Sequence, residues 1–244
     1  MKIEKIKKLS GSRYHLLIDN KKHIIYDDVL LAFNLYKPCN ITKDNYQKLI
    51  DKNSFYEGYY KALKYVSFKM RSEKEVYQKL ISLNIAKKEI DNIINKLKAD
   101  GYVDNIKYTH AFILDQINLT NNGPKKIALE LKKRGISDTI IDKEMETIED
   151  TVFIDNASKY IDKKVKINKS GSLEKLKLKL KNDLYNLGYL EKHFTEYLNS
   201  INIDEDKNYD KDKLKIEKRL SRKYQGEELE LRVKKALYSL GYKM

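Results

Sequence analysis

The sequence predicts a mainly α-helical protein made of tandem three-helix, helix-turn-helix-like repeats, preceded by a small N-terminal β-hairpin or sheet with helices. LYNLGY at residues 184–189 returns as LYSLGY at 237–242, and a structural unit that stacks on copies of itself explains such a repetition. The 244 residues include only 2 Pro and 9 Gly, which favours long regular elements. Residues 1–56 differ, because they carry short β-prone segments.

The repeated hexapeptide has the pattern of a helix end. Helices often end with a C′ residue in the left-handed conformation, which Gly adopts freely and Asn tolerates, and the next residue, C″, then packs back onto C3. Here Leu occupies C3 and a large apolar residue occupies C″. Four segments fit, at 80–85, 131–136, 184–189 and 237–242, with Asn84, Gly135, Gly188 and Gly241 at C′.

Each of these segments ends the second helix of a repeat. Ser72 and Glu75 form a capping box at the first such helix, and Pro124 follows Gly123 at the start of the second. The third and fourth are expected to begin near Ser172 and Gln225. The positions expected to be buried one turn before each leucine are Val76, Ile127, Leu180 and Val233.

Further helices flank each second helix. One precedes it, at about 57–70, 105–119, 151–163 and 209–223, and another follows it in the first three copies. The fourth copy is shortened because the sequence ends at Met244. The expected domains are an N-terminal α+β domain at 1–56 and repeats at 57–104, 105–150, 151–206 and 207–244. One repeat buries too little apolar surface alone, so neighbours are expected to stack into an elongated, curved array.

The N-terminal domain is expected to hold a small sheet. Residues 2–9, 13–18 and 22–26 are β-prone, and turn-forming residues separate them. Two short helices are expected to follow, at Asp27–Leu35 and Thr42–Asp51.

The charge balance predicts an anionic partner. Lys and Arg total 50 against 36 Asp and Glu, a formal charge of +14, and such an excess is typical of proteins that bind nucleic acid. The alternative is an AT-rich genome, which enriches Lys, Asn, Ile and Tyr by itself. No apolar run approaches the roughly 20 residues of a membrane span, and no secretory h-region is visible at the start. We therefore expect a cytoplasmic monomer.

The sequence offers no set of catalytic residues. His15, His23, His110 and His193 are scattered, and no phosphate-binding glycine loop is present. Cys39 is the only cysteine, which excludes an intrachain disulfide. The prediction is a non-enzymatic protein without a cofactor or a metal site.

Basic residues gather on the second helices and beside them. They could form a stripe that follows an anionic partner, although a solvated helix face is the simpler interpretation of any single lysine. The candidates for binding are Lys125, Lys126, Lys132, Lys133, Arg134, Lys175, Lys177, Lys179, Lys181, Arg219, Arg222, Lys223, Lys234 and Lys235.

Two other features could form contacts. Leu178 and Leu231 occupy the same position in the last two repeats, opposite the core stripe, and they either pack between those repeats or contact a partner. An acidic segment between Asp138 and Asp150 either pairs with nearby lysines or meets a basic region of a protein partner.

Several segments resemble the RecX family, regulators of the bacterial RecA recombinase. ALKYVSFKMRSEKEVYQKL (62–80) resembles the family's opening repeat, LKADGYVDNIKYTHAFI (97–113) its next junction, and NGPKKIALELKKRGI (122–136) its GP-containing segment. Asn84 departs from the usual Gly, and residues 36–39 replace a Lys-Gly turn. The residues that carry the family motifs, or their repeated stops, are Arg71, Ser72, Glu75, Leu80, Gly101, Tyr102, Asp104, Gly123, Pro124, Ile127, Leu131, Gly135, Gly188 and Gly241.

The resemblance implies a function that the periodicity does not. Such proteins bind RecA and its nucleoprotein filament, and they limit filament growth, recombination and coprotease activity in DNA repair and the SOS response without catalysing a reaction. An extended repeat array suits this task, because successive units can engage successive copies of the partner.

Direct DNA binding is the alternative function. Three-helix units with a basic second helix would also suit a helix-turn-helix protein acting on single- or double-stranded DNA without RecA. The basic faces contain Lys with few Arg, Asn or Gln, which argues against base readout.

Overall fold

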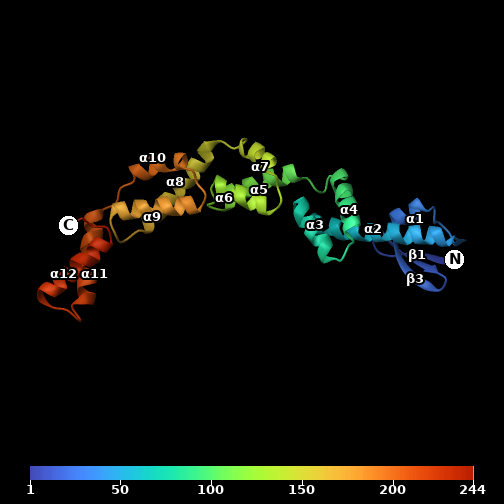
Figure 1. Ribbon diagram of the computed structural model, residues 1–244, viewed down its shortest axis with the longest axis horizontal. Coiled ribbons are helices and arrows are strands. Elements are labelled where there is room, and N and C mark those ends of the chain that lie inside the picture. The colour runs from blue at the N-terminus through green and yellow to red at the C-terminus, as the bar shows by residue number, and fades with distance from the viewer. Residues whose placement is uncertain (244) are drawn as a thin grey trace. The chain divides into compact units, whose positions relative to one another are not determined.

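The computed structural model describes residues 1–243. It divides into two compact units, Met1–Tyr108 and Thr109–Met244 (Figure 1). The first unit contains a small sheet and one three-helix repeat. Among its described residues, the second unit contains helices joined by loops and no strand.

The first unit opens with a four-stranded antiparallel sheet of order β3-β2-β1-β4. Its strands are β1 (Lys2–Lys8), β2 (Arg13–Ile18), β3 (Lys21–Tyr26) and β4 (Cys39–Asn40). Asp19 and Asn20 both have positive φ, 44° and 64°, as the tight hairpin turn between β2 and β3 requires. The three predicted strands are confirmed, whereas the two-residue β4 was not predicted.

Two helices cover this sheet, α1 (Asp27–Ala32) and α2 (Lys43–Ser67). Their shared core is formed by Ile3, Leu16, Ile18, Ile25, Val29, Leu30, Leu35 and Leu49. The sequence predicted two separate helices within residues 42–70, and this was wrong, because α2 is one helix of 25 residues. Nothing between Asp51 and Gly58 stops a helix, and Gly58 itself lies inside α2 against Ile93 and Ile85.

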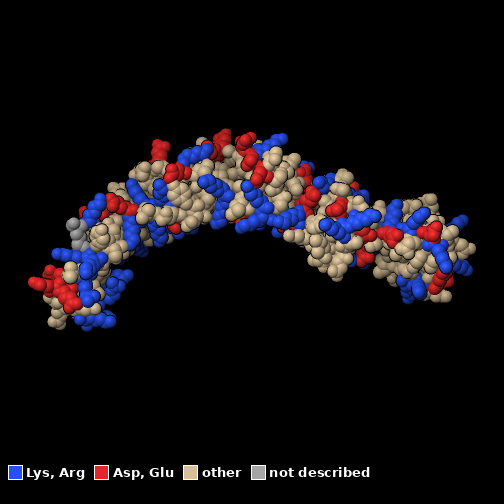
Figure 2. Space-filling model, in the orientation of Figure 1, with Lys and Arg blue, Asp and Glu red and all other residues tan. Residues whose placement is uncertain are grey.

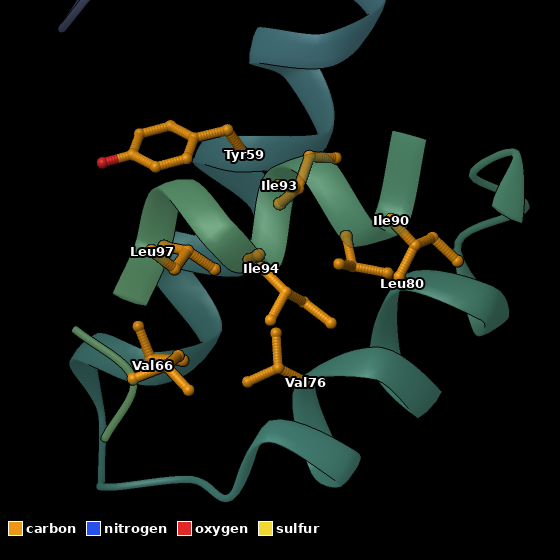
Figure 3. Packing of buried hydrophobic residues seen from close by; sticks show 10 residues of the cluster. Tyr59, Val66, Val76, Leu80, Ile90, Ile93, Ile94 and Leu97 are labelled. Atoms are coloured by element: carbon orange, nitrogen blue, oxygen red, sulfur yellow. The ribbon is translucent and has the colours of Figure 1, made fainter. Parts of the chain in front are cut away.

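The first repeat is formed by the C-terminal half of α2 with α3 (Glu73–Ser82) and α4 (Lys87–Ala99). The hydroxyl of Ser72 accepts a hydrogen bond from the Glu75 amide (3.2 Å), and the Glu75 carboxylate accepts one from the Ser72 amide (2.9 Å). This is the predicted capping box. Figure 3 shows the apolar side chains of all three helices meeting in one core. Its buried members include Tyr59, Val66, Val76, Leu80, Ile90, Ile93, Ile94 and Leu97.

The remaining helices build the later repeats. They are α5 (Asn105–Leu119), α6 (Pro124–Lys133), α7 (Asp138–Met145), α8 (Asp150–Ile167), α9 (Leu173–Asn186), the 3-10 turn η1 (Glu191–His193), α10 (Thr195–Ser200), α11 (Glu205–Leu220) and α12 (Gly226–Ser239). A mainly helical fold with tandem three-helix domains and a small N-terminal antiparallel sheet is confirmed.

The four predicted stops end the second helices α3, α6, α9 and α12. In each, the C″ amide donates to the C3 carbonyl of Leu80, Leu131, Leu184 or Leu237, at 3.0–3.3 Å. The C′ residues Asn84, Gly135, Gly188 and Gly241 all have positive φ. The C3 leucines are at most 1% exposed. Gly101 ends α4 in the same way, with the Tyr102 amide 2.8 Å from the carbonyl oxygen of Leu97.

Candidate functional site

The basic candidates fall into two groups. Members of the first group have partners inside the protein. Lys132 pairs with Asp138 (2.8 Å), and Lys133 and Arg134 both pair with Glu130 (2.8 and 2.9 Å). The ammonium groups of Lys175 and Lys177 donate to the carbonyl oxygens of Ser239 and Asn199, and Lys181 pairs with Glu191 (3.3 Å). These cations therefore stabilise ends of helices and contacts between them.

The second group is directed to solvent. The side chains of its members form no ion pair and no hydrogen bond with other described residues. They are Lys125, Lys126, Lys179, Arg219, Arg222, Lys223, Lys234 and Lys235. Figure 2 shows many Lys and Arg along the lower edge of the second unit, whereas its upper edge carries Asp and Glu together with Lys and Arg. Charge of one sign on one edge is the arrangement that attracts an anionic or acidic partner.

Successive second helices of the second unit meet end to end. The amides of Gly123 and Lys125, at the start of α6, donate to the carbonyl oxygens of Leu187 and Gly188, at the end of α9 (2.7 and 3.0 Å). A Cβ on Gly123 would lie 2.6 Å from the backbone carbon of Gly188. The free amides at the start of one helix are therefore satisfied by the free carbonyls at the end of the next.

The same junction recurs between α9 and α12. The Ser172 amide donates to the Leu240 carbonyl (3.0 Å), while the Ser172 hydroxyl accepts from the Lys175 amide and caps α9. Lys243 pairs with Glu174 across this junction (2.7 Å). Repeats 2, 3 and 4 thus present their second helices as one series whose order is fixed by backbone hydrogen bonds.

The family-motif residues near the first repeat support local structure. Arg71 lies over the ring of Tyr65, 4.2 Å from its centroid, and 3.6 Å from Glu75. The Asp104 carboxylate accepts from the amides of Ile106 and Lys107 and caps α5. Tyr102 is half exposed, whereas Ile127 and Leu131 of the second repeat are fully buried.

One of the two predicted alternatives for Leu178 and Leu231 was packing between the last two repeats. The structure does not show this packing. The two leucines are 61% and 54% exposed. Tyr185 and Tyr238, two turns further along the same helices, are 41% and 74% exposed. The tyrosines belong to the repeated hexapeptide, so the signal was visible in the sequence, but spacing alone does not distinguish an exposed tyrosine from a buried one.

Part of the acidic segment has basic partners inside the protein, and two of them are lysines, Lys132 with Asp138 and Lys192 with Asp150, which agrees in part with the predicted pairing to nearby lysines. Glu144 lies 3.1 Å from the His110 ring nitrogen, and Asp150 contacts Lys192 and His193. These two hydrogen bonds lower the pKa of the Asp150 carboxyl. His193 is buried against the ring of Phe153, and its burial lowers the pKa of the imidazole.

Asp212 is a buried carboxylate that the sequence did not single out. It accepts hydrogen bonds from the Ser170 hydroxyl (2.9 Å), the Gly171 amide (2.8 Å) and the Tyr242 hydroxyl (2.9 Å). Its position on α11 resembles that of any surface acid in a charged helix. These bonds tie the last two repeats together, and because its acceptor sites are occupied, Asp212 serves as a structural residue.

Potential metal ligands do not cluster within residues 1–243. In that part of the chain, no group of three or more His, Cys, Asp or Glu residues is placed to hold a metal ion. Cys39 is half-buried in β4. None of the helices described is both long enough and apolar enough to cross a bilayer.

Comparison with known proteins gives a consistent result. Two family models match, described as the first three-helix domain of RecX, at residues 59–97, and the second, at residues 107–145. The crystal structure of a regulatory protein RecX superposes with a TM-score of 0.70 at 22% identity, over 80% of this chain and 97% of that one. RecX from Lactobacillus salivarius superposes with a TM-score of 0.58 at 28% identity, over 62% and 99%.

Curated relatives match over nearly the full length. Regulatory protein RecX of Streptococcus sanguinis (strain SK36) is 30% identical over 99% of this chain and 95% of the relative. Regulatory protein RecX of Streptococcus agalactiae serotype III (strain NEM316) is 31% identical over 99% and 93%. The chain therefore belongs to the RecX family of regulatory proteins.

Proposed function

We propose that this protein is a non-enzymatic regulator of the RecA recombinase in the cytoplasm. It binds RecA and the RecA–DNA filament as a monomer and limits filament growth. ATP hydrolysis, strand exchange and coprotease activity fall as a consequence, in recombination, DNA repair and the SOS response. The observation that carries this proposal is the similarity to regulatory RecX proteins over nearly the whole chain.

The surface of the second helices supports the proposal. Successive second helices carry cations without internal ion pairs, for example Lys125 on α6, Lys179 on α9 and Lys234 on α12. A filament offers repeated copies of one binding site, and a repeat protein offers repeated copies of one helix face. Weak contacts made in series add through effective concentration.

The direct test measures RecA activity. With the cognate RecA on single-stranded DNA, the protein at substoichiometric amounts should lower ATP hydrolysis and strand exchange. The test pair is Lys234→Glu with Lys235→Glu, and the matched control is Lys211→Glu with Lys213→Glu, the same charge change on exposed lysines of the neighbouring helix α11. The test pair should weaken inhibition and the control should not. Unchanged ATP hydrolysis and strand exchange with the wild-type protein would falsify the proposal.

The alternative is binding to DNA without RecA, which the +14 charge favours. Binding that depends on phosphate contacts weakens steeply as salt rises, because counterions are released. Titration of a fluorescent oligonucleotide between about 50 and 200 mM salt, with and without RecA, separates the two functions. The alternative would be favoured if oligonucleotide affinity is the same with and without RecA and if inhibition of RecA activity weakens with salt in parallel with that affinity.

A further inference from the structure

The exposed faces of α9 and α12 carry the same three side-chain types at the same positions. They are Leu178, Lys181 and Tyr185 on α9, and Leu231, Lys234 and Tyr238 on α12. The spacings i, i+3 and i+7 place each set on one side of its helix. We name these six residues the leucine–tyrosine face.

The repeat core does not require this face. Leu180 and Leu184 of α9 are buried, as are Val233 and Leu237 of α12, on the opposite sides of the two helices. Single exposed apolar residues are ordinary, but the same apolar pair kept exposed in two successive repeats is characteristic of a binding surface.

The junction between α12 and α9 brings the two halves of the face together. Lys175, one turn before Leu178, donates to the carbonyl of Ser239, the residue after Tyr238. The Ser172 amide bonds to Leu240 at the same junction (3.0 Å). The end of α12 that carries Tyr238 therefore lies next to the start of α9, which carries Leu178.

One half of the face is held in place before any partner binds. The hydroxyl of Tyr185 donates to Glu191, and its ring packs edge-on against Phe194. The Lys181 ammonium lies 5.7 Å from the centroid of the same ring. A tyrosine fixed in this way loses little conformational freedom on binding.

The charges around the face select the partner. Lys234 within the face, and Lys179 and Lys235 beside it, form no ion pair with any described residue. Positive charge at the rim of an apolar surface complements an acidic rim around an apolar groove. DNA complements the lysines, but its surface is mostly polar and charged and buries little apolar side chain, whereas protein interfaces bury apolar side chains and are enriched in tyrosine.

We infer that the leucine–tyrosine face docks on a protein surface that has an apolar groove with acidic residues at its rim. Resting on the proposed function, this surface belongs to a RecA protomer, so that α9 and α12 contact the protein of the filament and not its DNA. Two apolar pairs in series suit one groove that is long enough for both helices, or the same groove on two protomers.

The test removes the apolar side chains and leaves the charge unchanged. Leu231→Ser with Tyr238→Ser is the test pair, and Leu178→Ser is an independent variant on α9. The matched control is Leu214→Ser, a 69% exposed leucine on α11 outside the face. Affinity is measured for cognate RecA without DNA, for the RecA–DNA filament and for a bare oligothymidylate. Circular dichroism and melting temperature check the fold of each variant.

The expected result is a loss of about tenfold or more in affinity for RecA, as for central interface residues, in the test pair and in Leu178→Ser. Oligothymidylate binding and the Leu214→Ser control should stay at the wild-type level. Wild-type RecA affinity in the folded variants would overturn this inference and leave the proposed function standing. A parallel loss of oligothymidylate binding would instead assign the face to DNA. A wild-type protein that does not bind RecA would overturn the proposed function as well.

Discussion

Two helix stops with the same local structure serve different purposes. Gly101 ends α4 and Gly188 ends α9, with φ values of 79° and 85°. The C3 leucines, Leu97 and Leu184, are both fully buried. A Cβ on Gly101 would meet nothing within 4 Å, whereas a Cβ on Gly188 would overlap the backbone of Lys126. The first stop only ends a helix, while the second also joins two repeats.

The starts of the second helices differ in the same sense. The start of α3 is capped by Ser72 and Glu75 of its own helix and by the Asn105 side chain, 3.0 Å from the Glu73 amide. The start of α6 at Gly123 has no side-chain cap and uses the end of α9 instead. A helix without its own cap gains one from its neighbour, and its stability then depends on that neighbour.

The shared part of the two stops should be equally important in both. Leu97→Ala and Leu184→Ala should each destabilise their own repeat by about 2–5 kcal/mol, because each empties a fully buried site. Hydrogen exchange in increasing urea, followed on peptides of each repeat, measures the two losses separately. A loss under about 0.5 kcal/mol at either site, the level of an ordinary surface substitution, would show that this leucine is not part of a packed core.

The glycines should separate the two stops. Gly101→Ala should cost about 1–2 kcal/mol, the cost of a left-handed conformation for a residue with a Cβ. Gly188→Ala should cost that amount plus about 1–3 kcal/mol for overpacking against Lys126. It should also increase hydrogen exchange at the Gly123 and Lys125 amides. Gly101→Ala should not, because Gly101 forms no such junction. Equal losses at the two glycines would mean that the junction does not stabilise the repeats.

The C″ tyrosines Tyr189 and Tyr242 provide a second matched pair. The Tyr242 hydroxyl donates to the buried Asp212. Burial, and to a smaller extent this hydrogen bond, raises the pKa of the phenol. Tyr242→Phe should therefore cost about 1.5–3 kcal/mol. The Tyr189 hydroxyl is buried without a hydrogen-bond partner among the described residues, and its burial raises the pKa to about 12.

Removing the Tyr189 hydroxyl should consequently be neutral or stabilising, because an unpaired buried polar group costs free energy. Urea unfolding of Tyr189→Phe and Tyr242→Phe compares the two directly. Destabilisation of more than about 1 kcal/mol, a typical net hydrogen bond, by Tyr189→Phe would show that a partner, such as a bound water, satisfies this hydroxyl.

Local signals in the sequence were enough to predict the repeats. The stop at Gly188 and the cap at Ser72 are each specified by a few neighbouring residues, so they could be identified without a structure. The junctions could not, because Gly123 and Gly188 meet only after the chain has folded, and no spacing rule links them. The continuous α2 was missed because the expected boundary near residue 56 came from aligning the repeats and not from a stop signal.

The candidate binding surface was predicted only in part. Composition identified the basic residues, but it did not distinguish Lys132, paired with Asp138, from Lys125, which has no such pair. Asp212 gave no signal, because a carboxylate in a charged helix is normally exposed. Burial and pairing are tertiary properties, and they decide which charges remain available to a partner.

The smallest expected effect concerns pH and distinguishes the third repeat from the first. Burial lowers the pKa of His193 below its usual 6.5, while Asp150 counteracts this in part. The unfolded chain therefore binds a proton more readily, so the third repeat should lose stability as the pH falls below about 6.5, and the loss should level off below the folded pKa. His193→Gln should remove this dependence between about pH 7.5 and 5.5. The measurement is hydrogen exchange of the whole protein in increasing urea, followed on peptides from α8 and α9. Peptides of α3 and α4 are the internal control, because no buried histidine lies in that repeat. A third repeat that becomes more stable on acidification would show that the Asp150 carboxylate, and not burial, dominates the titration of His193.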